Sequence, residues 1–224
     1  MPPPIRAGAL EPRWLDWGRR IQALAQTGLT FTQDAFDRER YGELRALAAE
    51  MMALAGDDPV SLLEDFEREL GYATPKVGVR GAVFRDDTIL LVRDRLSGLW
   101  APPGGWADVN ESPSEAVTRE VLEEAGVRTR AVKLIAVYDS RRRGAPQRQH
   151  VYRLFFRCVP DDTPPDAPNE RSPERERPAS ELEIDAVDYF TEHNLPPMVG
   201  SVPPDVVARL FVHARNPDFP TEFD

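Results

Sequence analysis

The chain has 224 residues, of which 41% are hydrophobic and 29% charged, a balance typical of globular proteins rather than disordered or fibrous ones. Its formal net charge of -10 argues against tight, sequence-independent binding to nucleic acid, because that affinity comes from many Lys and Arg side chains. No apolar run is long enough for the core of a signal peptide or for a bilayer span, so we expect a cytoplasmic protein that does not bind membranes.

The first part of the chain is predicted to be helical. From Pro12 onward, apolar residues recur at helical spacing in three groups, which predicts three helices. Pro12 suits the start of the first helix and Gly28 its end, while Asp58-Pro59 has the form of an N-cap followed by a first-turn proline. We therefore predict a small all-α domain over residues 1–73, followed by a second domain over residues 74–224.

In the second domain the pattern changes to short runs rich in β-branched and aromatic residues. Five strands and a final helix are expected, at residues 77–84, 88–92, 131–138, 150–158, 186–190 and 204–214. Arg85-Asp86-Asp87 is the predicted turn of a hairpin between the first two strands. The proline-rich segment 161–180 is expected to be an exposed loop. The order of the elements predicts an α+β fold.

One helix of the second domain has complete start and stop signals. The stretch GWADVNESPSEAVTREVLEEAGV begins at residue 105, and within it a helix is predicted over residues 113–125. Ser112 and Glu115 have the spacing of a capping box, and Gly126 suits the left-handed residue that ends a helix. These signals fix both boundaries of the helix.

Three carboxylates share one narrow face of this helix. At about 100° per residue, Glu120 falls between Glu123 and Glu124. Crowded carboxylates repel one another, and hard divalent cations prefer oxygen ligands, so a metal ion at this face would relieve the repulsion. The glycines Gly104-Gly105 would let a loop backbone approach the ion and offer it a carbonyl oxygen. An isolated glutamate pair is more often a solvated helix face, and the surrounding pattern disfavours that alternative here.

Further residues would hold the helix in place. Four apolar residues are expected on its other side, against the sheet: Val117, Val121, Leu122 and Ala125. Arg119 is expected to bridge to Glu111 and to steady the junction between loop and helix. The carboxylates would then be mounted on a rigid element and point in a fixed direction.

The same stretch resembles the signature of the Nudix hydrolase family. The matching positions are Gly105, Glu111, Arg119-Glu120-Val121, Glu123-Glu124 and Gly126-Val127. The resemblance implies an α/β/α sandwich around a mixed sheet. It also implies a Mg²⁺- or Mn²⁺-dependent pyrophosphatase, in which metal-activated water cleaves a nucleoside diphosphate linked to another group, giving a nucleoside monophosphate and a phosphorylated product.

The resemblance also implies roles for individual residues. Glu120 and Glu124 would be the principal metal ligands, Glu123 a further ligand or a base, and the carbonyl of Gly105 another ligand, while Glu111 and Arg119 look structural. Many family members take the general base from a loop outside the signature. Our candidate for that base is Glu183, with Glu181 next, although exposed loop glutamates are usually only solvated.

The flanking sequence resembles one subgroup of the family. The runs WLDWGRRIQALAQTGLTFTQDAFDRERYGELRALAAEM, HVYRLFF and YFTEHNLPP are similar to a subgroup with a small helical amino-terminal domain. Its members include CDP-choline and UDP-linked-substrate pyrophosphatases. An ADP-ribose or nucleotide-sugar pyrophosphatase is the alternative substrate class. A nucleotide-sensing or protein-interaction module without turnover is the alternative of another kind.

Candidate substrate contacts lie beside the signature and on the predicted strands. They are Arg80, Trp106, Tyr138, Asp139, Arg141 and His150. Arginine suits phosphate and an aromatic ring suits a base, but each residue also has a structural alternative, such as a solvated turn for Arg141 or packing for Trp106. The helical domain has mixed charge and apolar faces, so we expect it to cover a neighbouring subunit in a homodimer.

Overall fold

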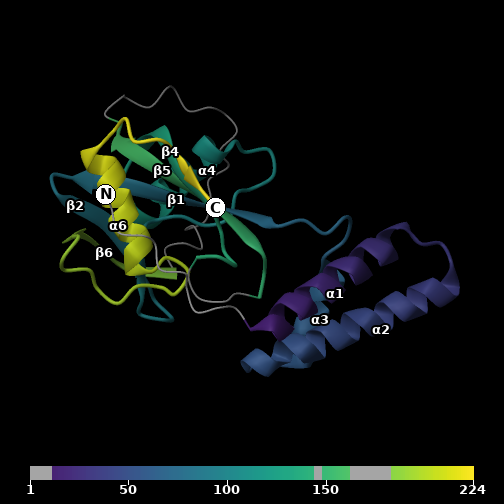
Figure 1. The fold of residues 1–224 in the computed structure, drawn as a ribbon. Coiled ribbons are helices and arrows are strands. Elements are labelled where there is room, and N and C mark those ends of the chain that lie inside the picture. The colour runs from purple at the N-terminus through teal and green to yellow at the C-terminus, as the bar shows by residue number, and fades with distance from the viewer. Residues whose placement is uncertain (1–11, 144–147, 162–182) are drawn as a thin grey trace. The chain divides into compact units, whose positions relative to one another are not determined.

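The structure is a computed structural model, which describes residues 12–143, 148–161 and 183–224. The segment predicted as a proline-rich loop lies outside these ranges except for Asp161. Among the described residues the chain divides into two compact units, and the division along the main path falls between Lys76 and Val77, close to the proposed domain boundary after residue 73. Residues 148–150 belong to the first unit. The elements together make a mixed α+β protein (Figure 1).

The first unit contains the three predicted helices. They are α1 (Arg13–Phe31), α2 (Ala35–Met52) and α3 (Pro59–Arg68), with a 3-10 turn, η1 (Ala53–Ala55), after α2. Asp58 caps α3 by accepting a hydrogen bond from the Ser61 N–H at 2.9 Å, and Pro59 occupies the first turn, as predicted. Buried apolar residues from all three helices form a core of Leu15, Ala49, Met52 and Leu62.

Gly28 does not end α1, so that prediction was wrong. The helix continues to Phe31, and Gly28 instead lies against the ring of Tyr41 on α2. A Cβ atom on Gly28 would come within 2.5 Å of that ring, and one on Gly18 within 2.6 Å of Met52. These glycines therefore allow α1 and α2 to pack closely. In the sequence, a glycine with this role cannot be distinguished from one that ends a helix.

The second unit is built on a seven-stranded sheet. Its order is β3-β2-β1-β5-β4-β7, with β6 also paired to β2. The strands are β1 (Lys76–Arg85), β2 (Thr88–Asp94), β3 (Trp100–Ala101), β4 (Thr129–Asp139), β5 (Val151–Pro160), β6 (Ile184–Thr191) and β7 (Glu222–Phe223). Strand β7 runs parallel to β4, whereas β2 is antiparallel to β1, β3 and β6.

The five predicted strands are all present, with ends that differ by a few residues. The predicted hairpin joins β1 to β2, and Asp86 adopts a positive φ of 53° in its turn. Two strands were not predicted, β3 and β7. Each is two residues long, too short for an alternating pattern, and each depends on pairing with a distant segment.

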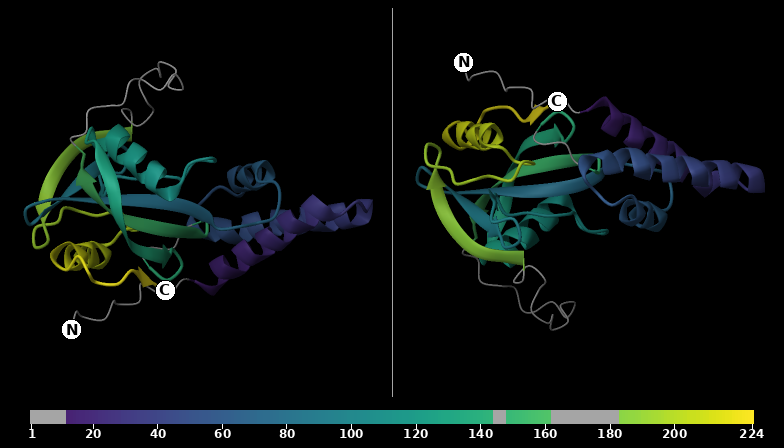
Figure 2. Two further views of the ribbon diagram at one scale, coloured as in Figure 1. Left: turned by 90° about the horizontal axis from the view of Figure 1, so that it is seen from above. Right: turned by 90° about the horizontal axis from the view of Figure 1, so that it is seen from below.

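Two helices cover opposite faces of this sheet (Figure 2). Helix α4 (Pro113–Ala125) packs on one face, and α6 (Pro204–Arg215) packs on the other. The core under α6 includes Leu210 and Phe211, and the core under α4 includes Val117 and Val121, all of them buried. The result is the expected α/β/α sandwich. No helix within the described ranges combines the length and apolar character that a bilayer span requires.

A buried polar cluster joins α6 to β7 around the carboxylate of Glu222. Tyr138 donates to Glu222 Oε2 at 2.9 Å, Arg209 donates to Oε1 at 2.9 Å, and His213 Nε2 lies 3.1 Å from Oε1. Burial lowers the pKa of His213 below its ordinary value, and the charges of Lys133 and Arg209 add to this, although Glu222 opposes it. His213 is therefore held neutral in the folded chain.

We expect the free energy of unfolding to decrease as the pH falls below about 6.5, because the unfolded chain then protonates His213 while the folded chain resists it. The loss is at most about 1.4 kcal/mol for each pH unit below that value. Urea denaturation at pH 7.5 and 5.5 measures it. His213→Gln should weaken the pH dependence, whereas His193→Gln, at an exposed position, should preserve it. Equal dependence in the wild type and His213→Gln would contradict the assignment.

Candidate active site

The loop after β3 lies along β1 through three backbone hydrogen bonds. Gly81 donates to Pro103 O at 2.8 Å, Val79 donates to Gly105 O at 2.9 Å, and Ala107 donates to Val77 O at 3.1 Å. The close approach requires glycine at position 104, where φ is +148° and a Cβ atom would lie only 2.1 Å from Val79 O. Backbone pairing thus fixes the position of the loop that leads into the signature.

Helix α4 has the predicted boundaries and caps. The Ser112 side chain accepts from the Glu115 N–H, and the Glu115 carboxylate accepts from the Ser112 N–H at 2.8 Å, which completes the capping box. Gly126 closes the helix with a left-handed φ of 69°. The capping residues of the sequence therefore determine where the glutamates of α4 stand relative to the loop.

We predicted that the glutamates lie opposite the apolar side of α4, and that prediction was wrong. They lie beside the apolar side. Glu124 follows Val117 by seven residues, which places it next to the buried valines Val117 and Val121. Leu122, predicted to pack against the sheet, is 44% exposed, so that prediction was wrong. Glu120 and Glu124 emerge at the border of the buried face and are themselves half-buried.

Partial burial changes the acidity of these two carboxyl groups. Burial raises the pKa of Glu124 to about 7, and the negative charges of Glu120 and Glu183 add to this rise. The charge of Arg80 opposes it, as does a hydrogen bond of 2.8 Å from the Gly104 N–H to Glu124 Oε2. Burial also raises the pKa of Glu120. Burying two carboxylates together is costly unless positive charge compensates them.

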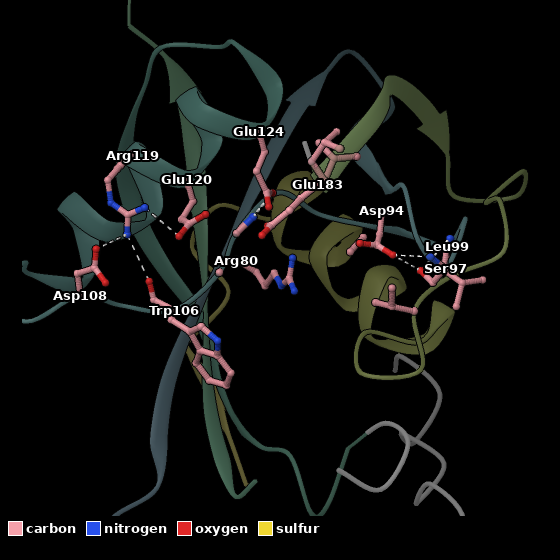
Figure 3. A pocket seen from close by; sticks show the side chains of 16 residues that line it. Arg80, Asp94, Ser97, Leu99, Trp106, Asp108, Arg119, Glu120, Glu124 and Glu183 are labelled. Atoms are coloured by element: carbon pink, nitrogen blue, oxygen red, sulfur yellow. Dashed lines mark hydrogen bonds and ion pairs between the residues drawn. The ribbon is translucent and has the colours of Figure 1, made fainter. Parts of the chain in front are cut away.

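The two glutamates line a cavity of about 570 Å³, a size suited to a small organic ligand. Of the predicted site residues, Arg80, Gly105, Trp106, Arg119, Glu120, Glu124 and Glu183 line this cavity. In Figure 3 the side chains of Glu124 and Glu183 point toward one another, next to Arg80. The Glu183 backbone is held by the Arg95 N–H, which donates to its carbonyl at 2.7 Å. Glu181 lies outside the described residues.

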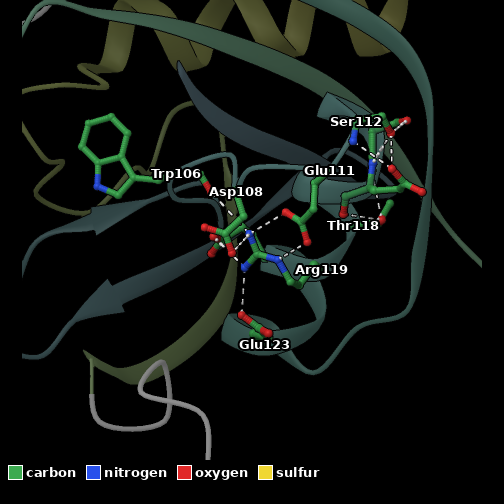
Figure 4. A network of polar contacts seen from close by, with 10 residues as sticks. Trp106, Asp108, Glu111, Ser112, Thr118, Arg119 and Glu123 are labelled. Atoms are coloured by element: carbon green, nitrogen blue, oxygen red, sulfur yellow. Dashed lines mark hydrogen bonds and ion pairs between the residues drawn. The ribbon is translucent and has the colours of Figure 1, made fainter. Parts of the chain in front are cut away.

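Arg119 forms the predicted bridge and extends it to other carboxylates (Figure 4). Its Nε and Nη2 donate to the two oxygens of Glu111 at 2.8 and 3.0 Å, and its Nη1 donates to Glu120 and Glu123 at 3.0 Å each. These contacts raise the pKa of Arg119, the Glu111 hydrogen bonds most of all. Glu123 pairs with Arg119 and is not among the residues that line the cavity. Its predicted role as ligand or base stays a prediction.

Four predicted substrate contacts lie elsewhere. Tyr138 is 2% exposed, and its hydroxyl donates to Glu222 in the cluster under α6. Arg141 forms an ion pair of 2.7 Å with Asp139, in the turn after β4. His150 belongs to the helical unit, where its carbonyl accepts from the Lys76 N–H at 2.9 Å. None of the four lines the cavity described above.

The cavity also includes residues that the sequence did not single out. Asp94 and Ser97, at the end of β2, line it together with Arg80. The Asp94 carboxylate accepts from the Ser97 side chain and N–H at 2.6 Å each, and these bonds lower the pKa of Asp94. Their signal in the sequence is that of an ordinary turn, which gives no indication of a site.

The donor atoms at the cavity fit a hard divalent cation. A Cβ atom on Gly105 would lie 2.7 Å from Glu120 Oε1, so the missing side chain makes room for that carboxylate. No group of three or more His, Cys, Asp or Glu side chains within the described ranges is arranged to hold a metal ion by itself. Mg²⁺ is commonly held by one or two carboxylates, with water and substrate phosphate as its other ligands. Glu120 and Glu124 can supply that pair.

Two family models match the chain. Residues 12–66 match a model described as a UDP-X-like, N-terminal oligomerisation domain, and residues 74–210 match the NUDIX domain. The second match covers strands β1 to β6, helix α4 and the first part of helix α6, and it therefore contains all the residues that line the cavity.

Relatives match over most of the chain. A Bacillus subtilis protein provisionally named an ADP-ribose pyrophosphatase is 39% identical over 96% of this chain and 99% of its own. A solved UDP-X diphosphatase is 30% identical with a TM-score of 0.56, covering 95% of this chain and 98% of that one. An ADP-ribose pyrophosphatase from Streptococcus suis is 31% identical with a TM-score of 0.54, covering 67% of this chain and 100% of that one.

Proposed function

Because this chain belongs to the Nudix hydrolase family and is a Nudix pyrophosphohydrolase, we propose that it cleaves the diphosphate of a nucleoside diphosphate linked to a second group, with Mg²⁺ or Mn²⁺ as its cofactor. The observation that carries the proposal is the pair of half-buried carboxylates, Glu120 and Glu124, in one cavity with Arg80 and Glu183. Enzymes of this family generally use divalent metal ions.

Glu120 and Glu124 would hold the cation, with the Gly105 carbonyl as a further oxygen donor. When bound, the cation supplies positive charge that lowers the pKa of a bound water and neutralises phosphate oxygens. Arg119 positions Glu120 through the hydrogen bond of 3.0 Å described above. Arg80 adds a fixed positive charge beside the two carboxylates, where the substrate diphosphate would lie.

Glu183 is the proposed general base, because it lines the same cavity and faces Glu124. It would accept the proton of the attacking water while the water oxygen bonds to one phosphorus and the bridging P–O bond breaks. The leaving phosphate keeps the electron pair of that bond, so the products are a nucleoside monophosphate and a phosphorylated second group. Trp106, which is 51% exposed, would stack on the nucleobase of the substrate.

Two substrate classes remain candidates. The flanking sequence and the similar UDP-X diphosphatase favour UDP- or CDP-linked compounds, whereas two similar proteins carry the name ADP-ribose pyrophosphatase. A panel of CDP-choline, CDP-ethanolamine, UDP-sugars and ADP-ribose, assayed with Mg²⁺ and with Mn²⁺, would identify the class. A chelator should abolish turnover and either cation should restore it. Turnover that persists in the chelator would contradict the cofactor, and binding without turnover of any compound would overturn the proposal.

The helical unit carries an apolar stripe that fits a second copy of the chain. Trp17, Leu24 and Phe31 follow one another at seven-residue spacing on α1 and are 45%, 68% and 68% exposed. Residues at this spacing share one face of a helix, and exposed apolar stripes commonly mark protein interfaces. The match of this region to an oligomerisation domain supports a homodimer.

A double substitution of this stripe, Leu24→Glu with Phe31→Glu, is expected to shift the protein from dimer to monomer at micromolar concentration. In the dimer the two new carboxylates would be buried at the interface, which is costly, whereas in the monomer they would be exposed to water. Light scattering measures the mass. Val60→Glu is the matched control, since Val60 is also apolar and 62% exposed but lies on α3. A wild-type monomer, or a dimer that survives the double substitution, would count against this interface.

A further inference from the structure

A second arginine lies on the sheet face next to Arg80. On β5, Arg153 is only 9% exposed, and its Cγ would be 4.0 Å from a Cβ atom built on Gly78 of β1. Gly78 and Arg80 are two residues apart on one strand, so they face the same side of the sheet. The Arg153 stem therefore lies within van der Waals distance of Gly78, on the strand that carries Arg80.

Trp106 lies next to the same glycine, Gly78. It forms a β-bridge with Gly78, and directly opposed residues of an antiparallel pair point to the same face. The position of a Gly78 Cβ atom is also 3.5 Å from the carbonyl oxygen of Gly105, one of the proposed metal ligands. Arg153, Arg80 and Trp106 thus border one small area of sheet that starts at the signature loop.

The two guanidinium groups are close enough to influence one another. Burial and the positive charge of Arg80 lower the pKa of Arg153 to about 10, so Arg153 remains charged at neutral pH. Arg80 is partly compensated by the charges of Glu120 and Glu124, and its Nη1 donates to Pro102 O at 2.9 Å. Two neighbouring cations on one face form a natural site for a polyanion with more than one phosphate.

We infer that Arg153 completes a diphosphate-binding subsite with Arg80, and that it holds the phosphate farther from Glu120 and Glu124. The inference rests on the proposed function for the identity of its ligand, a nucleoside diphosphate. Arg153 does not itself line the cavity, but Arg80 does, and Arg80 interacts electrostatically both with the two glutamates and with Arg153. A diphosphate beside Arg80 would therefore have one phosphate at the glutamates and one toward Arg153. Arg153 then contributes to binding, and the reacting bond lies on the glutamate side.

Arg153→Gln is expected to raise the Kd for ADP, UDP and inorganic pyrophosphate about 10- to 100-fold, the effect of losing a charge-assisted phosphate contact. Calorimetry with Mg²⁺ present measures these constants. Adenosine and uridine, which lack phosphate, should bind as they bind the wild type. With a substrate that is turned over, KM should rise by a similar factor while kcat changes less than about threefold. Arg153→Lys should recover part of the affinity.

The matched control is Arg157→Gln. Arg157 lies four residues along β5 on the same face, and its Nη1 donates to Ala214 O at 2.9 Å, a contact with α6. Its removal should leave the Kd for ADP and pyrophosphate unchanged, and thermal unfolding of both variants reports whether they fold. The subsite would be overturned if Arg153→Gln folds but binds ADP, UDP and pyrophosphate as the wild type does. It would also be overturned if the substitution weakens the binding of adenosine as much as that of ADP, or if the wild type binds none of the three phosphate compounds.

The binding and turnover results separate this inference from the proposed function. Arg153-dependent binding of ADP without turnover of any linked compound would refute the function and leave the subsite standing. Turnover with a KM that Arg153→Gln does not change would refute the subsite and leave the function standing.

Discussion

Glu124→Gln is expected to lower kcat about 1000-fold, since a bound metal ion contributes several kcal/mol of transition-state stabilisation. The fold should survive, because glutamine has the same size and its side-chain oxygen can still accept from the Gly104 N–H. The variant should be at least as stable as the metal-free wild type at neutral pH, because burial raises the pKa of Glu124 to about 7 and the amide removes the cost of a buried charge.

Thermal unfolding with and without Mg²⁺ provides the readout that activity alone cannot. The wild type should gain stability from the cation and Glu124→Gln should not, because a cation stabilises only a protein that binds it. Glu123→Gln is the matched comparison on the same helix, where Glu123 pairs with Arg119, and we expect a loss of about tenfold or less in kcat. Near-normal turnover of Glu124→Gln would overturn its assignment, and an equal loss for Glu123→Gln would make Glu123 a principal ligand.

Gly104→Ala is expected to lower the free energy of unfolding by about 3 kcal/mol or more and turnover by about 100-fold. The added Cβ would meet the backbone of β1, 2.1 Å from Val79 O and 2.8 Å from the Cα of Arg80, and φ of +148° is itself unfavourable for alanine. Neither obstacle can be relieved by a side-chain rotation. The loop would have to leave β1 and would take with it the contact between Gly104 and Glu124.

Gly56→Ala tests the effect of an unfavourable φ without a steric clash of the added Cβ atom. Gly56 also has a positive φ, of +102°, but no heavy atom lies within 4 Å of its added Cβ. We expect a cost of about 1 kcal/mol and unchanged turnover. Urea denaturation and a steady-state assay of both variants test the comparison. If Gly104→Ala were no more damaging than Gly56→Ala, the backbone pairing of the loop would not be what positions the site.

Much of the fold could be predicted from the sequence because its signals are local. The caps of α4 act within one turn on either side of the helix, so Ser112 and Gly126 fix its limits without help from the rest of the chain. The five longer strands show an alternating or apolar pattern over enough residues to be recognised. Strands β3 and β7 could not be predicted, since two residues carry no period and only their partners make them strands.

The candidate site was predicted only in part, because some of its contacts are local in the sequence and others join distant segments. Glu120 and Glu124 stand in a contiguous signature, and the bridge from Arg119 to Glu111 follows from its spacing. Tyr138 was expected at the substrate, but its hydroxyl serves Glu222, a residue that returns to the sheet 84 positions later along the chain. Arg153 was missed, because its relation to Arg80 arises only when β1 and β5 become neighbours.

The way Glu183 is held has a consequence for how this enzyme can change in evolution. Strand β6, which follows directly, pairs with β2 from Ile184 opposite Asp94 to Thr191 opposite Thr88, with one register shift between Arg93 and Asp94, and the Arg95 N–H donates to the Glu183 carbonyl. The position of the proposed base therefore depends on pairing downstream of it rather than on the chain upstream. A change in the length of the chain between β5 and residue 183 is therefore expected to leave the proposed base in place.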